Sequence, residues 1–343
     1  MQTEIRETNA LFDKIVALVE ETRKKVATAV NTAMVRTYFE IGRYIVENEQ
    51  GGQHRAEYGK AILKELSAKL TERFGKGWSV ETLQNIRTLY LSYSPKIVNG
   101  VYDFSLSWSH YLVLMRIENL DERNFYEIEC KNQDWSVRQL SRQVNSSLYE
   151  RLALSRNKNE VMALSKKGQT VEKAQDIIKN PLTLEFLGLK EDSSYSESKL
   201  ESAIITKMQD FLLELGKGFL FEARQKRFTF DEEHFFVDLV FYNRLLRCYV
   251  LIDLKIDKLT HQDLGQMQMY VNYFDRYVKQ DFENQTIGIL LCKEKKDTLV
   301  ELTLPKDSNI FAQEYRLYLP DKILLQQKMK EWIAEFENKE VTL

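Results

Sequence analysis

The chain has 343 residues, of which 43% are hydrophobic and 29% are charged, as in ordinary soluble proteins with room for two cores. It contains no apolar run near the roughly 20 residues that a membrane helix needs, and its start shows no charged-then-apolar signal pattern. Its three scattered cysteines and four histidines show no disulfide or zinc spacing, which argues against a zinc enzyme and favours a cytoplasmic location.

The net charge of −2 is unevenly distributed along the chain. Residues 1–180 carry 27 Lys and Arg against 23 Asp and Glu, a net charge of +4, and residues 181–343 carry 22 against 28, a net charge of −6. If the protein binds nucleic acid, we expect the first half to supply much of the sequence-independent attraction to phosphate.

Residues 1–165 predict an all-helical domain. Apolar residues recur at helical spacing from Leu11 to Val46, and a pair of glycines follows that helix. A second helix is expected from Tyr58 to Phe74 and a third from Val80 to Tyr93, separated by a short glycine-containing turn.

The two helices within residues 58–93 are arranged as in a helix-turn-helix. In that interpretation the second helix presents Gln84 and Arg87 to a DNA groove, with Lys76 near a phosphate. A helix, a glycine turn and a helix are also the simplest way to build a bundle, so packing or subunit assembly stays open as the alternative.

The remaining helices of this domain are expected at 108–118, at 121–130, and as one helix whose apolar stripe runs from Val137 to Leu152. Four basic side chains lie off that stripe: Arg138, Arg142, Arg151 and Arg156. They form the most basic stretch of the chain, which predicts either a phosphate-contacting surface or a solvated helix face.

A junction is expected at 166–185, followed by an α/β domain over residues 186–343 with a mixed central sheet flanked by helices. Its expected elements are a helix at 199–215, a strand at 219–228, a hairpin at 235–255, a helix at 260–278, strands at 286–291 and 316–319, and a helix at 323–336.

The hairpin from Phe235 to Lys255 carries two acidic residues inside apolar strands. Because strand side chains alternate between faces, Asp253 shares a face with Lys255. A carboxylate in such a strand costs several kcal/mol unless it is compensated, so Asp238 and Asp253 indicate a divalent metal site beside a lysine. A buried ion pair between Asp253 and Lys255 is the structural alternative.

The order of Asp238, a gap of fifteen residues, and then Asp253-Leu254-Lys255 resembles the signature of the PD-(D/E)XK nuclease superfamily, with Val237 in place of the proline. Downstream, Gln266 and Tyr270 resemble the QxxxY helix of RecB-like members. The chain as a whole resembles the YhcG-type family, in which a helical N-terminal domain precedes a PD-(D/E)XK domain.

The resemblance implies a nuclease that hydrolyses phosphodiester bonds with Mg²⁺ or Mn²⁺, as an endonuclease or exonuclease, in DNA more than in RNA. Asp238 and Asp253 are the expected metal ligands, joined by Glu201 at the start of its helix. Lys255 is expected to orient the attacking water or to stabilise the transition state. A binding or assembly protein that uses an inactive nuclease fold as a scaffold is the alternative.

Four further residues have weaker assignments. Gln266 and Tyr270 lie on one helix face and would orient Lys255, touch DNA, or, in the case of Tyr270, simply pack. Arg224 and Gln225 would reach a phosphate from the first strand of the domain. We also expect a homo-oligomer without membrane contact.

Overall fold

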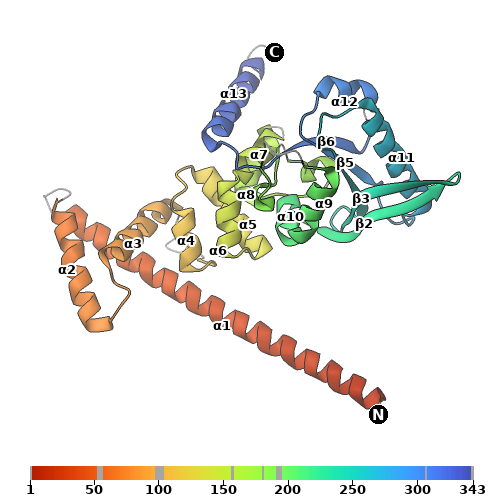
Figure 1. The fold of residues 1–343 in the computed structure, drawn as a ribbon. Coiled ribbons are helices and arrows are strands. Elements are labelled where there is room, and N and C mark those ends of the chain that lie inside the picture. Colours follow the sequence, from red (N-terminus) through yellow and green to blue (C-terminus); the bar gives the residue numbers. More distant parts are fainter. Residues whose placement is uncertain are drawn as a thin grey trace. The chain divides into compact units, whose positions relative to one another are not determined.

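The computed structural model describes residues 2–51, 57–96, 104–155, 158–179, 181–190, 195–305 and 307–340. It divides into two compact units, Met1–Leu140 and Ser141–Leu343 (Figure 1). Among the residues described, no helix combines the length and apolar character that crossing a bilayer requires.

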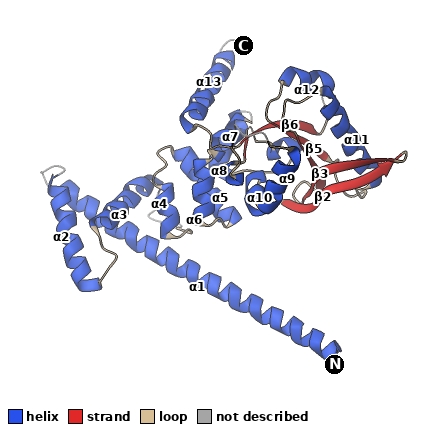
Figure 2. Cartoon of the chain, viewed as in Figure 1, coloured by secondary structure: helices blue, strands red, loops and turns tan. Residues whose placement is uncertain are grey.

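The first unit is helical throughout its described residues, as the sequence predicts (Figure 2). Its helices are α1 (Gln2–Gly51), α2 (Glu57–Phe74), α3 (Val80–Tyr93), α4 (Trp108–Leu114) and α5 (Leu120–Gln133), and α6 (Val137–Asn145) begins at its end. The expected bounds of α3 are confirmed, and Ser79 caps this helix by accepting a hydrogen bond from Thr82 N at 3.1 Å.

Helix α3 packs closely against the second half of α1. Leu83 and Ile86 of α3 are fully buried, and a Cβ atom on Gly42 of α1 would lie 2.5 Å from the Ile86 carbonyl oxygen. Arg87 Nε donates to Glu49 Oε2 of α1 at 2.7 Å. The helix expected to read DNA therefore uses one face, including Arg87, to build its own bundle.

The second unit contains a mixed β-sheet (Figure 2), and the order of its strands is β1–β6–β5–β4–β3–β2. The strands are β1 (Leu182–Thr183), β2 (Phe219–Phe230), β3 (Glu233–Asn243), β4 (Cys248–Leu254), β5 (Ile287–Cys292) and β6 (Ile310–Arg316). β2, β3 and β4 are antiparallel to one another, whereas β4, β5, β6 and β1 are parallel. The expected mixed α/β architecture is confirmed.

Helices cover both faces of this sheet. Helices α9 (Glu197–Thr206) and α10 (Met208–Leu215) pack on one face, and α11 (His261–Tyr277) packs on the other and contacts α12 (Asp297–Thr303). The unit also contains α7 (Leu148–Leu154), which packs against α8 (Lys158–Lys167) and α13 (Lys322–Glu340). Val250 and Ile252 of β4 join the core under α9 and α10, while Leu251 joins the core under α11. This alternation is the one expected for the hairpin, and it places Asp253 on the face of Leu251.

The contact between α11 and the sheet depends on a glycine in β5. A Cβ atom at Gly288 would lie 2.7 Å from both Cγ and Sδ of Met267, which is buried on α11. The helix that carries Gln266 and Tyr270 therefore approaches the sheet at a distance that leaves no room for a methyl group.

Three expected elements differ from the structure. The helix predicted at 199–215 is two helices separated at Lys207, whose ψ of 31° is not helical. The helix predicted through 137–152 is interrupted at Ser147, which has a φ of 53°; serine side chains compete with helical hydrogen bonds and favour such breaks. The last strand is Ile310–Arg316 and not 316–319, because this inner parallel strand lacks a clear alternating pattern.

The boundary between the two units lies at Leu140 and Ser141, whereas the expected junction at 166–185 falls inside the second unit. A buried ionic cluster accounts for this difference. Arg151 Nη1 lies 2.5 Å from Glu214 Oε1 of α10, and both side chains are fully buried. Arg142 Nη1 lies 3.1 Å from Glu214 Oε2, and Lys179 Nζ donates to the Glu214 carbonyl oxygen.

We call Arg142, Arg151, Lys179 and Glu214 the Glu214 cluster. It overturns the expectation that Arg142 and Arg151 belong to a phosphate-contacting surface, because the Arg142 side chain is only 13% exposed and that of Arg151 is inaccessible. Helical periodicity shows which side of a helix a residue occupies but not whether another element covers it. Arg138 is exposed, and Arg156 lies outside the described residues.

Candidate active site

Two carboxylates meet across adjacent antiparallel strands. Leu239 of β3 pairs with Ile252 of β4, so the next residues outward, Asp238 and Asp253, are cross-strand neighbours. Leu254 N donates to Asp238 Oδ2 at 2.8 Å, and Asp253 is only 4% exposed. The hairpin therefore brings together the two acidic residues that the sequence singled out.

Nearby positive charge only partly offsets the cost of burying the Asp253 carboxylate. Burial raises its pKa to about 7 with help from the negative charge of Asp238, and Lys255 opposes the rise only partly. Lys255 Nζ lies 2.8 Å from Asp253 Oδ2. Burial lowers the pKa of Lys255, but Asp253 and Glu197 more than offset this, so its pKa is raised and it stays an ammonium.

Glu201, buried on α9, is tied to Asp238 through Gln225 of β2. Gln225 Nε2 donates to Glu201 Oε2 at 2.7 Å and to Asp238 Oδ1 at 2.8 Å, and Arg224 forms an ion pair with Glu201 Oε1. Gln225 has a φ of 47°, an uncommon backbone conformation for a non-glycine residue within a strand. The structure thus places Arg224 and Gln225 around Glu201, where we had expected phosphate contacts.

Glu197, one turn before Glu201 on α9, is a site residue that sequence reasoning missed. Burial raises its pKa, the charge of Asp238 raises it further and that of Lys255 lowers it, while Ile256 N–H donates a hydrogen bond to it. The available signal was a second acidic residue four positions before Glu201, since such residues share a helix face.

Asp263 is a second residue that was missed. Its Oδ1 lies 3.9 Å from Lys255 Nζ, and the residue also forms a capping box with Thr260 at the start of α11. The Thr260–Asp263 spacing was visible in the sequence as a helix start. The lysine is therefore surrounded by Asp253, Glu197 and Asp263.

Gln266 and Tyr270 lie together on α11 as the resemblance implies. Gln266 Nε2 donates to Tyr270 Oη at 2.7 Å, and Tyr270 is 1% exposed. Burial raises the pKa of Tyr270 to about 12, and the nearby charge of Asp253 contributes. This helix face therefore borders the carboxylates.

Apart from Arg142 of the Glu214 cluster, the other predicted nucleic-acid contacts belong to the first unit. Lys76, Gln84 and Arg138 are exposed there, whereas Arg87 is paired with Glu49 as described above. Their contact with nucleic acid stays a prediction.

The donor set at Asp238 and Asp253 fits a hard divalent cation. Among the described residues, no group of three or more His, Cys, Asp or Glu side chains could hold a metal. Mg²⁺ commonly needs only one or two carboxylates and leaves its other positions to water and substrate phosphate. Two adjacent carboxylates, one of them with a pKa near neutrality for want of positive charge, suit that kind of site.

The structure is similar to the crystal structure of a repair endonuclease from Pyrococcus abyssi, with 19% sequence identity and a TM-score of 0.25. The matched region covers 38% of this chain and only half of that chain.

Sequence comparisons cover nearly all of the chain. Residues 14–151 match the DUF1016 N-terminal domain, and residues 175–330 match the YhcG PDDEXK nuclease domain, which contains every carboxylate of the candidate site. The chain is 37% identical to the protein named "Putative nuclease YhcG" from Escherichia coli (strain K12), and the match covers 91% of each. The chain therefore belongs to the YhcG family, with a helical DUF1016 N-terminal domain and a C-terminal PD-(D/E)XK nuclease domain of the restriction-endonuclease-like fold.

Proposed function

We propose that this protein hydrolyses phosphodiester bonds in DNA with the help of Mg²⁺ or Mn²⁺. The observation that carries the proposal is Asp253, a buried carboxylate whose pKa is raised to about 7, next to Asp238 and Lys255 in a nuclease-family domain. Strongly perturbed carboxylates of this kind cluster at functional sites. A scaffold protein would gain nothing from retaining one.

In the proposed reaction Asp238 and Asp253 hold the cation. A bound divalent cation would neutralise these carboxylates and stabilise negative charge on the scissile phosphate. Lys255 carries three N–H donors and stays protonated, so it orients the attacking water and stabilises the charge that develops on the phosphate oxygens. Glu201 fixes Gln225, which in turn fixes the orientation of Asp238.

Two further features bear on the nucleic-acid contacts of the helical unit and on the cellular compartment of the protein. The helical unit, residues 1–140, carries 19 Lys and Arg against 19 Asp and Glu, so its candidates for phosphate contacts are the individual exposed residues Lys76, Gln84 and Arg138 and not a net positive charge. All three cysteines are buried and none forms a disulfide, which supports a reducing compartment such as the cytoplasm.

A cleavage assay with the full chain tests the proposal. Supercoiled plasmid, single-stranded DNA and RNA are incubated with Mg²⁺, with Mn²⁺ or with a chelator. We expect metal-dependent DNA cleavage that Asp253→Asn abolishes and that Asp281→Asn, a change at an exposed carboxylate, leaves intact. Cleavage of no substrate, or equal cleavage by Asp253→Asn, would overturn the proposal, and cleavage of RNA alone would replace its substrate.

The contribution of the helical unit is tested separately through salt dependence. Lys76→Ala and Arg138→Ala in the full chain should each reduce the slope of log affinity against log salt by about 0.9 if each removes one contact with duplex phosphate. If the slope is unchanged in both variants, these residues do not contact DNA phosphate, and the helical unit would serve in subunit assembly instead.

A further inference from the structure

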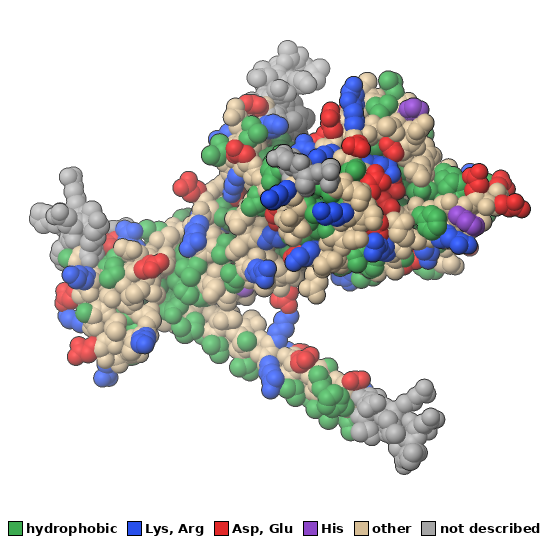
Figure 3. All heavy atoms as spheres, viewed as in Figure 1, with side chains coloured by type: hydrophobic (Ala, Val, Ile, Leu, Met, Phe, Trp, Pro, Cys, Tyr) green, Lys and Arg blue, Asp and Glu red, His purple; other side chains and the backbone are tan. Residues whose placement is uncertain are grey.

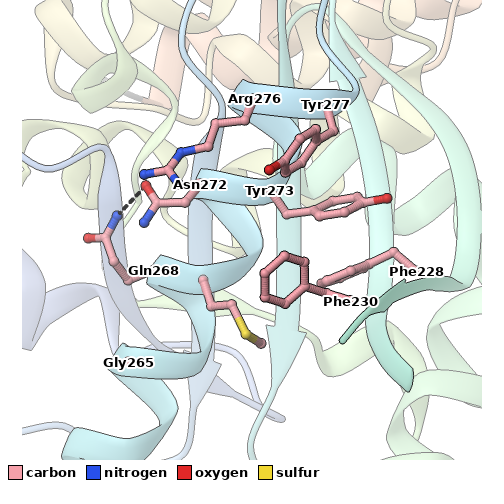
Figure 4. A pocket seen from close by; sticks show the side chains of 9 residues that line it. Phe228, Phe230, Gly265, Gln268, Asn272, Tyr273, Arg276 and Tyr277 are labelled. Carbon is pink, nitrogen blue, oxygen red and sulfur yellow. Dashed lines mark hydrogen bonds between the residues drawn. The ribbon is translucent and has the colours of Figure 1, made fainter. Parts of the chain in front are cut away.

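An open pocket of about 350 Å³ lies between β2 and α11, outside the carboxylate site (Figure 4). Phe228 and Phe230 from β2 form one side of it, and Tyr273 and Tyr277 from α11 form another. Phe230 is 52% exposed and Tyr277 is 65% exposed. The proposed reaction does not use these rings, although large exposed aromatic surfaces commonly mark binding sites.

A chain of ring contacts connects this pocket to the carboxylate site. Phe228 stacks on Tyr273 with ring centroids 4.1 Å apart, and Phe228 makes a T-shaped contact with Tyr270 with centroids 5.5 Å apart. Tyr270 and Phe228 share a buried core with Leu251, which lies two residues before Asp253 on the same face of β4. The pocket is therefore a neighbour of the site where the proposed cleavage occurs.

The pocket also carries polar groups suited to a base and a phosphate. Gln268 Nε2 donates to Asn272 Oδ1 at 3.2 Å, so the two amides lie side by side at the pocket and keep further donors and acceptors (Figure 4). Arg276 adds a guanidinium to the lining. Amides recognise the edges of bases, guanidinium groups bind phosphate, and aromatic rings stack on base faces.

We propose that this pocket binds one unpaired nucleobase of the strand presented for cleavage. The inference rests on the proposed nuclease function and narrows its substrate to nucleic acid with an unpaired base near the cut. The volume lies at the lower end of the range of small-ligand pockets, which suits a single nucleoside. A fully paired duplex would have to unstack a base to fill the pocket.

Fluorescence of 2-aminopurine in single-stranded DNA tests this proposal with the full chain. We expect binding to quench the probe, and Phe230→Ala combined with Tyr277→Ala to abolish the quenching and weaken single-strand affinity by about 5- to 100-fold. Fully paired duplex should bind both proteins equally. Phe282→Ala is the matched control, since Phe282 is 70% exposed but does not line the pocket.

Two outcomes would overturn the pocket assignment: the double variant binds single strands as well as Phe282→Ala does, or it loses duplex affinity to the same extent. Cleavage by the wild type is scored independently. If the wild type cleaves DNA and the double variant still binds the base normally, the pocket assignment fails and the nuclease proposal stands. If the wild type does not cleave DNA but quenches the probe, and the quenching is lost in the double variant, the nuclease proposal fails and the pocket assignment stands.

A second, independent observation concerns the first half of α1. Eight large apolar side chains there are each more than 40% exposed: Leu11, Phe12, Ile15, Leu18, Val19, Val26, Val30 and Met34. The second half of the same helix is covered by α3, with Val35 fully buried and Phe39 5% exposed. Figures 1 and 3 show that α1 extends well beyond α2 and α3 of its own unit.

The exposed stretch is self-complementary when read in opposite directions from its centre, between Thr22 and Arg23. Antiparallel alignment about this point pairs three apolar positions on the central stripe: Ile15 with Val30, Val19 with Val26, and Phe12 with Ala33. The flanking charges also match, because the acidic pair Glu20 and Glu21 then lies opposite the basic pair Lys24 and Lys25 of a second copy. Parallel pairing in register would bring like charges together along these flanks.

We infer that a second copy of this chain covers the stripe, through an antiparallel two-fold pairing of α1. Such an interface is isologous, because each copy supplies the same surface to the other. Residues 11–34 extend over about 36 Å, enough for three to four heptads of contact. The ion pairs that Lys24 and Lys25 make within one copy, to Asp134 and Glu21, are both exposed and therefore exchangeable.

Sedimentation of the full chain measures the pairing. We expect a dimer at micromolar concentration that Val19→Glu combined with Val26→Glu converts to a monomer, without loss of fold because both side chains are exposed. Glu20→Lys with Glu21→Lys should weaken the dimer at least tenfold, and adding Lys24→Glu with Lys25→Glu should restore it. A monomeric wild type would overturn the inference.

Cysteine cross-linking measures the direction. A mixture of Val19→Cys and Val26→Cys proteins should form the mixed disulfide rapidly, because antiparallel pairing brings these positions together. The native cysteines are buried and should not compete. Preferential disulfides between two copies of the same variant would instead indicate parallel pairing and refute the antiparallel assignment.

Discussion

The second unit buries two carboxylates in opposite electrostatic conditions. Burial alone would raise the pKa of Glu214, but Arg151, Lys179 and Arg142 more than offset it and hold the pKa at about 2. Asp253 has a second carboxylate beside it and a single nearby lysine, so its pKa is about 7. The comparison teaches that burial of a charge does not identify a functional site; the missing compensation does.

The largest expected effect comes from breaking the compensated site. Arg151→Met should lower the free energy of unfolding by about 3–5 kcal/mol, because it leaves Glu214 buried with less positive charge. Chemical denaturation measures the loss. Arg138→Met, a change at an exposed arginine, should stay within about 0.5 kcal/mol of the wild type, and equal losses in the two variants would remove the distinction.

Removing the lysine from the uncompensated site should affect cleavage and not folding. Lys255→Ala should reduce cleavage by a factor of about 10² or more, which corresponds to about 2.7 kcal/mol in the barrier. Stability should change by less than about 1 kcal/mol, because Asp253, whose pKa is already near 7, can take up a proton. A loss of about 3–5 kcal/mol in stability would show that the pair is structural.

Stability against pH separates the two carboxylates further. The raised pKa of Asp253 means that its stabilising contribution is complete below its unfolded pKa of 3.8 and is lost as the pH rises through 7. Without metal, Asp253→Asn should therefore match the wild type near pH 4 and exceed it by about 1–3 kcal/mol at pH 8. A constant difference across this range would contradict the raised pKa.

Glu214 should show the reverse behaviour in the same titration. Its folded pKa of about 2 lies below the ordinary 4.5, so its contribution is complete above pH 4.5 and is lost as the pH falls toward 2. Glu214→Gln should be less stable than the wild type at pH 7, and the difference should shrink below pH 4.5. Persistence of the full difference near pH 2 would argue against an ionised Glu214.

The smallest effect concerns Gln225, which links Asp238 to Glu201. Gln225→Ala should be about 1 kcal/mol less stable than Gln225→Gly, because only glycine adopts a φ of 47° without steric cost. Both variants lose the amide, so both should cleave more slowly than the wild type to the same extent. Different cleavage rates would mean that the backbone, and not the amide, positions Asp238.

The sequence predicted the hairpin and its carboxylates because they depend on local alternation. Asp238, Asp253 and Lys255 lie on strands whose apolar neighbours fix the two faces, and the motif order identifies the fold. Glu197 was missed because an acidic residue at a helix start is common for helix-dipole reasons alone.

The Glu214 cluster could not be predicted from local pattern. Glu214 lies 63 residues from Arg151 and 72 from Arg142, and nothing in the helical spacing of either segment indicates the other. Without that contact, arginines beside an apolar stripe suggest a solvated face, and the segment that carries them suggests the helical domain. Only the tertiary structure shows that this segment packs with the second unit, although residues up to 151 match the DUF1016 N-terminal domain in sequence.

Gly288 of β5 lies where α11 packs closely against the sheet of the nuclease unit. The helix that carries Gln266 and Tyr270 rests on the sheet where a side-chain methyl group would come within 2.7 Å of Met267. Gly288→Ala would add no charge and no hydrogen-bonding group, yet the side chains of Met267 and Val271 on this helix would have to shift to admit the methyl group. The absence of a side chain at Gly288 therefore lets the helix that carries Tyr270 pack closely on β5, the strand that pairs with β4.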